Sequence, residues 1–340
     1  MRQKHFVRGA IDVSLLVALM LATGIATTFA QASSADVALP GAAAQDTCVT
    51  CGDGPTGGCT SIMAGKLATT DGSVITAHTC DGNYRTWLNI EPAQQHSQGS
   101  MRQVYWGKLH NETPWDMRGL RLKGEIPQAD STFAYFNVAY PAMNEKGLSI
   151  GETTIGGRNE LRNPEGMFLI ENLQALALER TTNARDAIRL IGELVAEYGY
   201  GDYGECLTFA DAKEVWHFEI HGAGPFEVGA VWAAVRIPDD HVGVSANIPR
   251  ISTLDLDNSD YYMASENVHS LAEEMGWWDP SSGEEFKFWE AYSGRTPFSI
   301  REFFILSTLA PDLGLTMDME ELPFSVKPNH KVSVADCRPR

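Results

Sequence analysis

The stretch GGCTSIMAGKLATTDGSVITAHTCDG, residues 57–82, contains the pattern that decides how this chain folds. Two runs of residues that suit strands, 60–67 and 74–79, lie on either side of the turn sequence Asp71-Gly72. Such an arrangement predicts a β-hairpin. Cys59 opens the first run, directly after a Gly-Gly pair, and no tryptophan precedes it. We therefore expect the folded body to begin at or near Cys59.

The residues before this stretch have a different composition. Three basic residues near the start precede an uncharged stretch, 13–35, which is apolar at 15–22 and closes on Ala30-Gln31-Ala32. This order is typical of a secretory signal peptide. We predict a signal peptide over 1–32 and an exported protein (periplasmic, extracellular or cell-surface), with an uncleaved membrane anchor as the alternative. Residues 33–58, rich in Ala, Gly, Ser, Thr and Asp, are interpreted as a propeptide or linker.

The charge balance limits the classes of partner. The chain has 340 residues, and its 44 acidic and 26 basic side chains give a net charge of −18 at neutral pH. Binding to a phosphate backbone needs clustered basic side chains, so we expect no nucleic-acid partner. We also expect no stable membrane insertion once the signal peptide is removed. The sequence leaves the formation of a homo-oligomer open.

Further along, strand-like and helix-like segments alternate. Strands are predicted at 133–138, 148–153, 206–210, 214–221, 230–237 and 242–246. Apolar residues at helical spacing predict two amphipathic helices between 160 and 200, the first with Pro164 in its first turn and the second starting at Asn183. Shorter helices are predicted from 265 to 276 and over 300–306. Two groups of hairpins separated by a helical pair predict an α+β fold, with helices packed on antiparallel sheets.

Six cysteines lie at positions 48, 51, 59, 80, 206 and 337. In an exported protein an even number suggests three disulfides by default. Cleavage after Gly58 would instead give Cys59 both a thiol and a free α-amino group. Since an α-amino group has a pKa of about 8, it could accept the thiol proton, and one residue would supply nucleophile and base. The spacing alone leaves both roles of Cys59 open.

The pair Cys48-x-x-Cys51 could bind a metal or undergo redox chemistry, but a disulfide within a discarded propeptide, or no role, is favoured.

Several blocks of sequence occur in the order found in one enzyme family. They are CTSIMAGK at 59–66, DGS at 71–73, HTCDG at 78–82, MNEKGL at 143–148, GETT at 151–154, GGR at 156–158, LALER at 176–180, EYGY at 197–200, EVW at 214–216, ANIPR at 246–250 and PFSVKP at 323–328. Together they resemble peptidase family C69, cysteine dipeptidases of the N-terminal nucleophile hydrolase superfamily. The resemblance covers nearly all of residues 59–340, interpreted as the dipeptidase domain. Members of the family usually continue well beyond the last block, so we expect the C-terminal part of this domain to be incomplete.

The resemblance implies a four-layer αββα sandwich that is processed autocatalytically between Gly58 and Cys59. It implies that Cys59 attacks the amide carbonyl of a dipeptide, that its α-amino group is the general base, and that water hydrolyses the acyl-enzyme without metal or cofactor. Asp81 matches an aspartate that binds this amino group in related amidases, with a turn residue as the alternative. His78 takes the place of an arginine beside the thiolate. Because imidazole stabilises a thiolate less than guanidinium does, a spacer role for His78 is equally open.

Three further residues follow from the same resemblance. Asn247 matches an asparagine of the oxyanion hole, where a side-chain amide is typically worth about 2.7–4 kcal/mol of barrier. A turn asparagine after the 242–246 strand is the alternative. Thr153 and Thr154 fall near a further oxyanion or substrate contact. All three are therefore candidates for contact with the substrate.

One strand carries a second candidate constellation, and two other functions stay open. His217, Glu219 and His221 alternate along one strand face and could hold Zn²⁺, although we favour a strand that shows its polar side to water.

Beside the dipeptidase, the chain could be an amidase or acylase of the same superfamily that acts on a non-peptide N-acyl amide. It could also be a catalytically silent, disulfide-containing exported binding protein.

Overall fold

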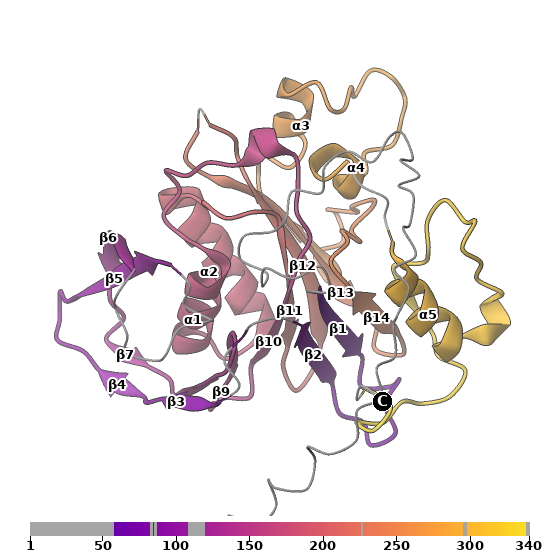
Figure 1. Ribbon diagram of the computed structural model, residues 1–340, viewed down its shortest axis with the longest axis horizontal. Helices are drawn as coiled ribbons and strands as arrows, with labels where there is room; N and C mark the ends of the chain where they lie inside the picture. The colour runs from indigo at the N-terminus through magenta and orange to yellow at the C-terminus, as the bar shows by residue number, and fades with distance from the viewer. Residues whose placement is uncertain are drawn as a thin grey trace, which may run out of the picture. The chain divides into compact units, whose positions relative to one another are not determined.

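The computed structural model describes residues 58–81, 84, 87–107, 120–225, 227–294 and 298–337, which are coloured in Figure 1. The predicted signal peptide and all but the last residue of the predicted propeptide lie outside the described residues. The strands with a described partner pair antiparallel, and a small number of helices packs against them. This combination confirms the predicted α+β class.

A four-stranded sheet contains the start of the described chain. Its order is β16-β14-β1-β2. The strands are β1 (Gly58–Ala64), β2 (Ile75–Asp81), β14 (Val242–Ser245) and β16 (Ser325–Val326). β1 and β2 form the predicted hairpin, and Gly72 in its turn has a φ of 81°, a conformation that favours glycine. The hairpin prediction is therefore confirmed, although the first strand runs from Gly58 to Ala64 and not over 60–67 as predicted.

An eight-stranded sheet has the order β15-β13-β12-β11-β10-β9-β8-β3. Its strands are β3 (Asn89–Glu91), β8 (Tyr135–Asn137), β9 (Pro141–Asn144), β10 (Ser149–Thr154), β11 (Glu205–Ala210), β12 (Val215–Gly222), β13 (Ala230–Ile237) and β15 (Tyr262–Ala264). Two short ribbons lie outside it, β4 (Gln94–Gln95) with β7 (Ser131–Thr132) and β5 (Met101–Trp106) with β6 (Arg121–Pro127). The β1–β2 hairpin packs against β10 and β11. Gly151 lets the two sheets approach, because a Cβ at that position would lie 2.8 Å from Thr208 Oγ1 and 3.2 Å from Ser61 Oγ.

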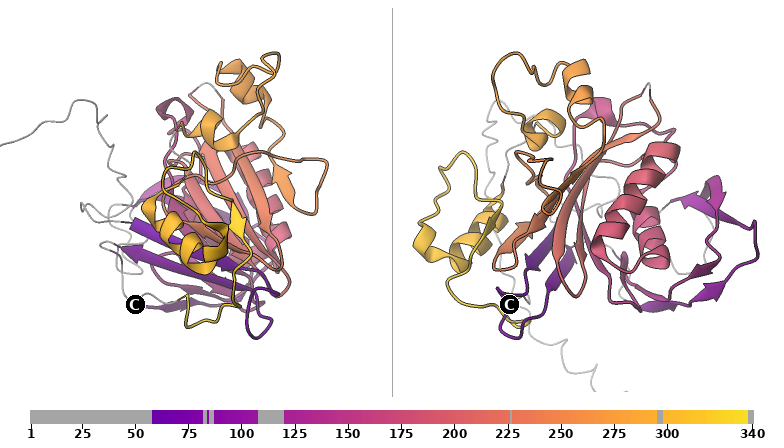
Figure 2. Two further views of the ribbon diagram at one scale, coloured as in Figure 1. Left: turned by 90° about the vertical axis from the view of Figure 1, so that its right-hand side faces the viewer. Right: turned by 180° about the vertical axis from the view of Figure 1, so that it is seen from behind.

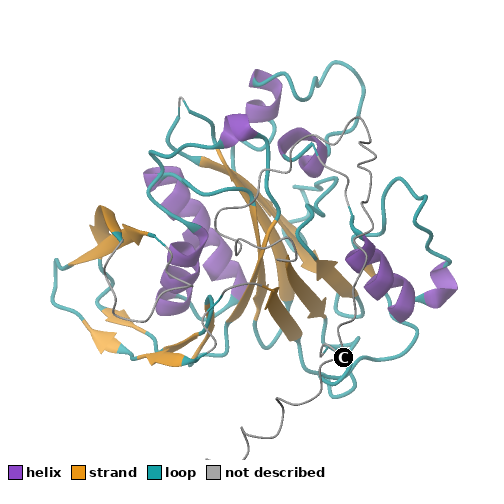
Figure 3. Ribbon diagram, viewed as in Figure 1, coloured by secondary structure: helices purple, strands orange, loops and turns teal. Residues whose placement is uncertain are grey.

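Helices α1 (Ile170–Arg180) and α2 (Ala184–Tyr198) pack on the large sheet on the side away from the small sheet (Figures 1 and 3). α2 starts at Asn183 as predicted, because the Asn183 side chain accepts a hydrogen bond from Asp186 N at 3.0 Å. The start predicted for the first helix is wrong. Pro164 lies in a turn, and the helix begins at Ile170, whose backbone N–H donates to Asp202 Oδ2 at 3.1 Å. Asp202 lies in a distant part of the chain, so local sequence does not reveal this contact.

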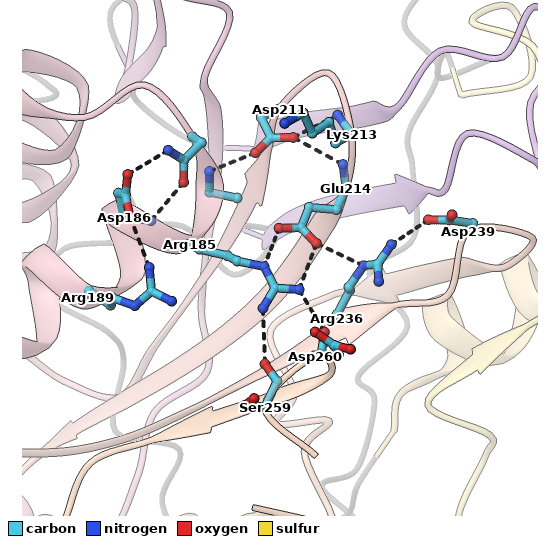
Figure 4. A network of polar contacts seen from close by, with 12 residues as sticks. Arg185, Asp186, Arg189, Asp211, Lys213, Glu214, Arg236, Asp239, Ser259 and Asp260 are labelled. Atoms are coloured by element: carbon cyan, nitrogen blue, oxygen red, sulfur yellow. Dashed lines mark hydrogen bonds and ion pairs between the residues drawn. The ribbon is translucent and has the colours of Figure 1, made fainter. Parts of the chain in front are cut away.

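A network of ion pairs joins the start of α2 to the large sheet (Figure 4). Glu214 accepts from Arg185 Nε at 2.6 Å and Nη2 at 3.0 Å, and its second oxygen lies 3.0 Å from Arg236 Nε. Arg236 also pairs with Asp239 at 2.7 Å. Asp211 Oδ2 accepts from the backbone N–H of Ala184 at the first residue of α2, at 3.0 Å. These contacts fix the helix relative to β12 and β13.

The last third of the chain adds α3 (Ser270–Glu274), α4 (Phe288–Tyr292), α5 (Ile300–Leu309) and a 3-10 turn at Pro311–Leu313. Another 3-10 turn, Asn159–Leu161, precedes α1. α5 packs against β14 and β16 (Figure 2). Val244 of β14 packs with Leu306 of α5, whereas the next residue, Ser245, contacts Thr153 of the large sheet. Since neighbouring strand residues face opposite sides, α5 covers the face of the small sheet turned away from the large one. Among the described residues, no helix combines the length and apolarity needed to cross a bilayer.

Candidate active site

The β1–β2 hairpin gathers sulfur and nitrogen groups on one face. Cys59 lies opposite Cys80, and Ser61 lies opposite His78. Residues two apart on a strand share a face, so these four side chains point the same way. His78 Nδ1 lies 3.0 Å from Ser61 Oγ, and His78 Nε2 lies 2.8 Å from Cys80 Sγ. Burial lowers the pKa of His78, although Glu152 acts to raise it, so the imidazole is predominantly neutral at pH 7.

The Cys59 side chain is fully buried within a cluster of titratable groups. Cys59 Sγ, Cys80 Sγ, a ring nitrogen of His78 and a carboxylate oxygen of Glu152 all lie within 4.8 Å of one another. Tyr84 Oη lies 4.0 Å from Cys59 Sγ. Glu152 comes from β10, so both sheets contribute to the cluster. The thiol therefore has groups beside it that can exchange a proton or stabilise a thiolate.

Asn247 and Arg301 hold the backbone at Cys59. Cys59 N donates to Asn247 Oδ1 at 2.7 Å. Arg301, on α5, donates from Nη1 to Cys59 O at 2.7 Å and from Nη2 to Asn247 Oδ1 at 2.9 Å. The same guanidinium donates to Thr60 Oγ1 at 3.0 Å and to Ala246 O at 2.8 Å. Arg301 therefore ties α5 to the start of β1 and to the end of β14.

The backbone of Asn247 adopts a left-handed conformation with a φ of 61°, the one such case among the non-glycine residues that the structure describes. Asparagine tolerates this region better than most residues. Its Nδ2 donates to Thr154 O at 2.7 Å while its Oδ1 faces Cys59 N. One hydrogen of Nδ2 serves that contact, and the group carries a second. The predicted oxyanion role of Asn247 stays a prediction, and its contact with the nitrogen of Cys59 is a finding.

The two predicted substrate threonines are both buried, and they point to different partners. Thr154 Oγ1 donates to Glu152 Oε1 at 3.2 Å, and the Thr154 carbonyl holds Asn247. Thr153 Oγ1 lies 2.6 Å from Ser245 Oγ, between the two sheets. Thr154 therefore lies beside the cluster around Cys59. The contact found for Thr153 is with β14 of the small sheet, and its role in substrate binding stays a prediction.

Asp81 closes β2, opposite Gly58, and its side chain is exposed. In the uncleaved chain the nitrogen of Cys59 is held by Asn247. The register still places Asp81 across from the residue that precedes Cys59. Its predicted contact with the amino group concerns the cleaved chain and stays a prediction.

The constellation on β12 is buried, not exposed to water as we expected from its alternation. His217, Glu219 and His221 are at most 1% exposed, because the small sheet, the loop after β14 and α4 cover that face. His217 Nε2 lies 2.7 Å from Glu219 Oε1, and its Nδ1 lies 3.5 Å from Cys206 Sγ. Burial acts to lower the pKa of His217, but Cys206 and Glu219 outweigh it and raise the pKa to about 10. Glu219 also accepts from Ile251 N at 3.1 Å and so anchors the loop that carries Asn247.

A cavity of about 580 Å³ opens beside the cluster. Its lining comes from β2, the segment after β2, the β8–β9 connection, β9 and β10: Thr76, His78, Cys80, Tyr84, Trp87, Leu88, Val138, Ala139, Tyr140, Ala142, Met143, Ser149, Ile150 and Gly151. This volume lies within the range of small-molecule sites. A larger cavity, about 1080 Å³, is lined by α5 and by Thr60, Ile62 and Thr79, which lie on the other face of the hairpin from Cys59 and Ser61. Of the cluster around Cys59, His78 lines both cavities, whereas Cys80 lines the smaller one and not the larger. The smaller cavity is therefore the better candidate for a substrate of Cys59.

Sequence reasoning missed two members of the site. Glu152 lies inside the GETT block that carried part of the resemblance, so that block held a signal for it. Arg301 lies in a predicted helix outside every quoted block, and no local signal distinguishes it from a surface arginine. Its importance comes from the packing of α5 on the small sheet.

Sequence similarity to known proteins extends over most of the chain. The sequence model of peptidase family C69 matches residues 58–339. The chain belongs to peptidase family C69. Among curated relatives, the C69 chain is 30% identical over 249 residues to a probable dipeptidase of Salmonella dublin, covering 69% of this chain and 53% of the relative. It is 27% identical over 294 residues to a probable dipeptidase of Latilactobacillus sakei, covering 82% and 59%. It is 25% identical over 305 residues to dipeptidase A of Lactobacillus helveticus, covering 82% and 60%. The matches thus span between half and three-fifths of these relatives.

Proposed function

We propose that this C69 chain is the precursor of a cysteine dipeptidase and that Cys59 becomes its N-terminal nucleophile. One observation carries the proposal. Cys59, the first residue after the Gly-Gly pair, has its thiol in a cluster of titratable groups. The backbone nitrogen of the same residue donates a hydrogen bond to Asn247 Oδ1 at 2.7 Å. The dipeptidases among the relatives support a small peptide as substrate.

Processing would convert the peptide nitrogen of Cys59 into an amine. The Cys59 thiolate attacks the carbonyl carbon of Gly58, the C–N bond breaks, and the nitrogen takes up the thiol proton. Water then hydrolyses the resulting thioester. The products are a carboxylate on Gly58 and a free thiol and amine on Cys59, so the atoms balance.

In the processed enzyme the amine accepts the thiol proton, and the thiolate attacks the carbonyl of a dipeptide. The protonated amine then donates to the leaving amine of the substrate, and water hydrolyses the acyl-enzyme with the amine again as base. Asn247 Oδ1 would orient the amine, since it already holds this nitrogen. The neutral His78 and Glu152 lie close enough to affect the thiolate.

The arrangement of layers supports the finer fold class. α1 and α2 cover one side of the large sheet, the small sheet faces its other side, and α5 covers the small sheet. We propose that this is the four-layer αββα sandwich of N-terminal nucleophile hydrolases, with Cys59 at the start of a strand of the small sheet. Export of the precursor remains a proposal from the N-terminal sequence alone.

The decisive experiment is mass spectrometry of the purified protein together with a hydrolysis assay. The expected mature chain begins at Cys59, is alkylated there by iodoacetamide and hydrolyses dipeptides. Cys59→Ala is expected to remain uncleaved after Gly58 and inactive, whereas Cys337→Ser, the matched thiol control, is expected to behave as the unaltered chain.

Other outcomes would assign the alternatives. A mature chain starting near residue 32, with Cys59 in a disulfide, would refute the hydrolase and favour the binding protein. Cleavage at Gly58 with hydrolysis of N-acyl amines but not of dipeptides would favour the amidase or acylase.

A further inference from the structure

A four-donor cluster surrounds the thiol of Cys59, and its composition is that of a metal site. Two sulfurs, one imidazole nitrogen and one carboxylate oxygen come from Cys59, Cys80, His78 and Glu152, and all four lie within 4.8 Å of one another. We infer that this cluster binds one Zn²⁺ ion, which reversibly blocks the nucleophile. Binding of the ion follows from the donors alone, and only its effect on turnover rests on the proposed function.

The spacing of the donors suits a tetrahedral ion. Zn²⁺ binds sulfur at about 2.3 Å and nitrogen or oxygen at about 2.0–2.2 Å, so tetrahedral ligand atoms lie roughly 3.3–3.8 Å apart. The donors therefore need to move by only about 1 Å or less to reach these separations. Cys59 and Cys80 are directly opposite on paired strands, which places their Cβ atoms on one face at about 4.5–5.5 Å. The backbone thus presents the two sulfurs together without rearrangement of the sheet.

The neighbours of the donors have the arrangement of an outer ligand shell. His78 Nε2 points to Cys80 Sγ, while Ser61 Oγ lies 3.0 Å from the other ring nitrogen, Nδ1. A histidine that ligates a metal usually makes such a second contact, which fixes the ring and its tautomer. Thr154 Oγ1 donates to Glu152 Oε1 at 3.2 Å and orients that carboxylate. Both non-sulfur donors are therefore held before an ion arrives.

The donor set favours Zn²⁺ over harder cations. Thiolates and imidazole suit Zn²⁺, whereas Mg²⁺ and Ca²⁺ prefer sites built only from oxygen. On binding, both thiols lose their protons, and the Cys59 sulfur becomes a zinc ligand that cannot attack a carbonyl. When a chelator removes the ion, the Cys59 thiol is free of the metal and can act as a nucleophile again. The cluster would therefore act as a metal-sensitive brake on the enzyme.

Cobalt titration tests the binding directly. Co²⁺ is added under argon to the reduced full chain in which Cys48 and Cys51 are serine, so that the CxxC pair contributes nothing. We expect one equivalent to give the visible bands of tetrahedral Co²⁺ and the near-ultraviolet charge-transfer band of two thiolates, both abolished by Zn²⁺. Cys80→Ser is expected to halve the charge-transfer band and weaken binding by at least ~10–100-fold. Glu152→Gln is expected to weaken binding while keeping both thiolate contributions.

The matched control is Cys337→Ser, which removes a thiol outside the cluster and is expected to leave the cobalt spectrum unchanged. Inhibition is measured in parallel, with each variant compared with its own metal-free rate. Zn²⁺ should inhibit the unaltered enzyme reversibly and Cys80→Ser at higher concentration. An octahedral spectrum without charge transfer, or a two-thiolate spectrum that survives Cys80→Ser, would overturn the site. A two-thiolate spectrum in a protein that hydrolyses no dipeptide would support the site and refute the proposed function instead.

Discussion

Arg301 is the residue whose replacement tests most sharply how the site is built. Its guanidinium makes four hydrogen bonds of 2.7–3.0 Å, to Cys59 O, Thr60 Oγ1, Ala246 O and Asn247 Oδ1. Hydrogen bonds to a charged group are worth about 1.5–3 kcal/mol each, but they are not additive, and this guanidinium is only partly buried. We expect Arg301→Met to lower the free energy of unfolding by roughly 2–3 kcal/mol.

The effect on processing should exceed the effect on stability. Arg301 touches both Cys59 and Asn247, so its loss lets the two residues shift relative to each other. A misplacement of about 1 Å can lower a rate by about 10²-fold. We therefore expect Arg301→Met to slow cleavage after Gly58 by about that factor. Arg301→Lys keeps the charge, but one ammonium cannot reach four acceptors. Its cleavage rate should therefore lie between that of the unaltered chain and that of Arg301→Met.

Urea denaturation and a time course of cleavage by mass spectrometry measure both effects. Arg189→Met is the matched control, because Arg189 is 56% exposed in its pair with Asp186 (Figure 4). It should cost about 0.5 kcal/mol or less and leave cleavage unchanged. If Arg301→Met is cleaved at the unaltered rate, the positioning role assigned to Arg301 is wrong. Equal losses in both variants would show that the four hydrogen bonds of Arg301 stabilise the fold no more than the exposed pair of Arg189 does.

Three further predictions concern stability. Glu214→Gln weakens both ion pairs of the network at the start of α2. It should lower the free energy of unfolding, measured in urea, by roughly 2 kcal/mol. A loss smaller than that of Arg189→Met would contradict the stabilising role of the network. Asn183→Ala removes the α2 cap and should cost about 1 kcal/mol, with Asn183→Gly costing less; equal costs would argue against the cap. The pKa of His217 is raised to about 10 in the folded protein, against 6.5 in the unfolded chain. Between these two pH values the native state therefore binds one more proton than the unfolded state. The contribution of His217 to stability is complete below pH 6.5 and is lost as the pH rises towards 10. Urea midpoints from pH 7 to 9.5 should therefore fall more steeply in the unaltered chain than in His217→Gln, and parallel curves would refute the raised pKa.

Much of the fold was readable from local patterns. The Asp71-Gly72 turn between two strand-like runs predicted the first hairpin, and apolar spacing predicted both mid-chain helices. The N-cap of α2 was also correct, because Asn183 and its partner lie three residues apart in one turn. The start of α1 was not, because Asp202, which accepts the hydrogen bond from the first N–H of the helix, lies 32 residues away from Ile170. Local sequence predicts interactions that close within a few residues and misses those that depend on packing.

The site divides along the same line. By itself the sequence determined that Cys59 lies at the start of the first strand and that Asn247 follows a later strand, because both belong to local motifs. Only the tertiary structure decided that Asn247 holds the nitrogen of Cys59, that Arg301 binds both, and that Glu152 joins the two thiols and His78. The physical reason is that a strand pattern fixes which face a side chain occupies, whereas the packing of the two sheets and α5 decides what lies across from it.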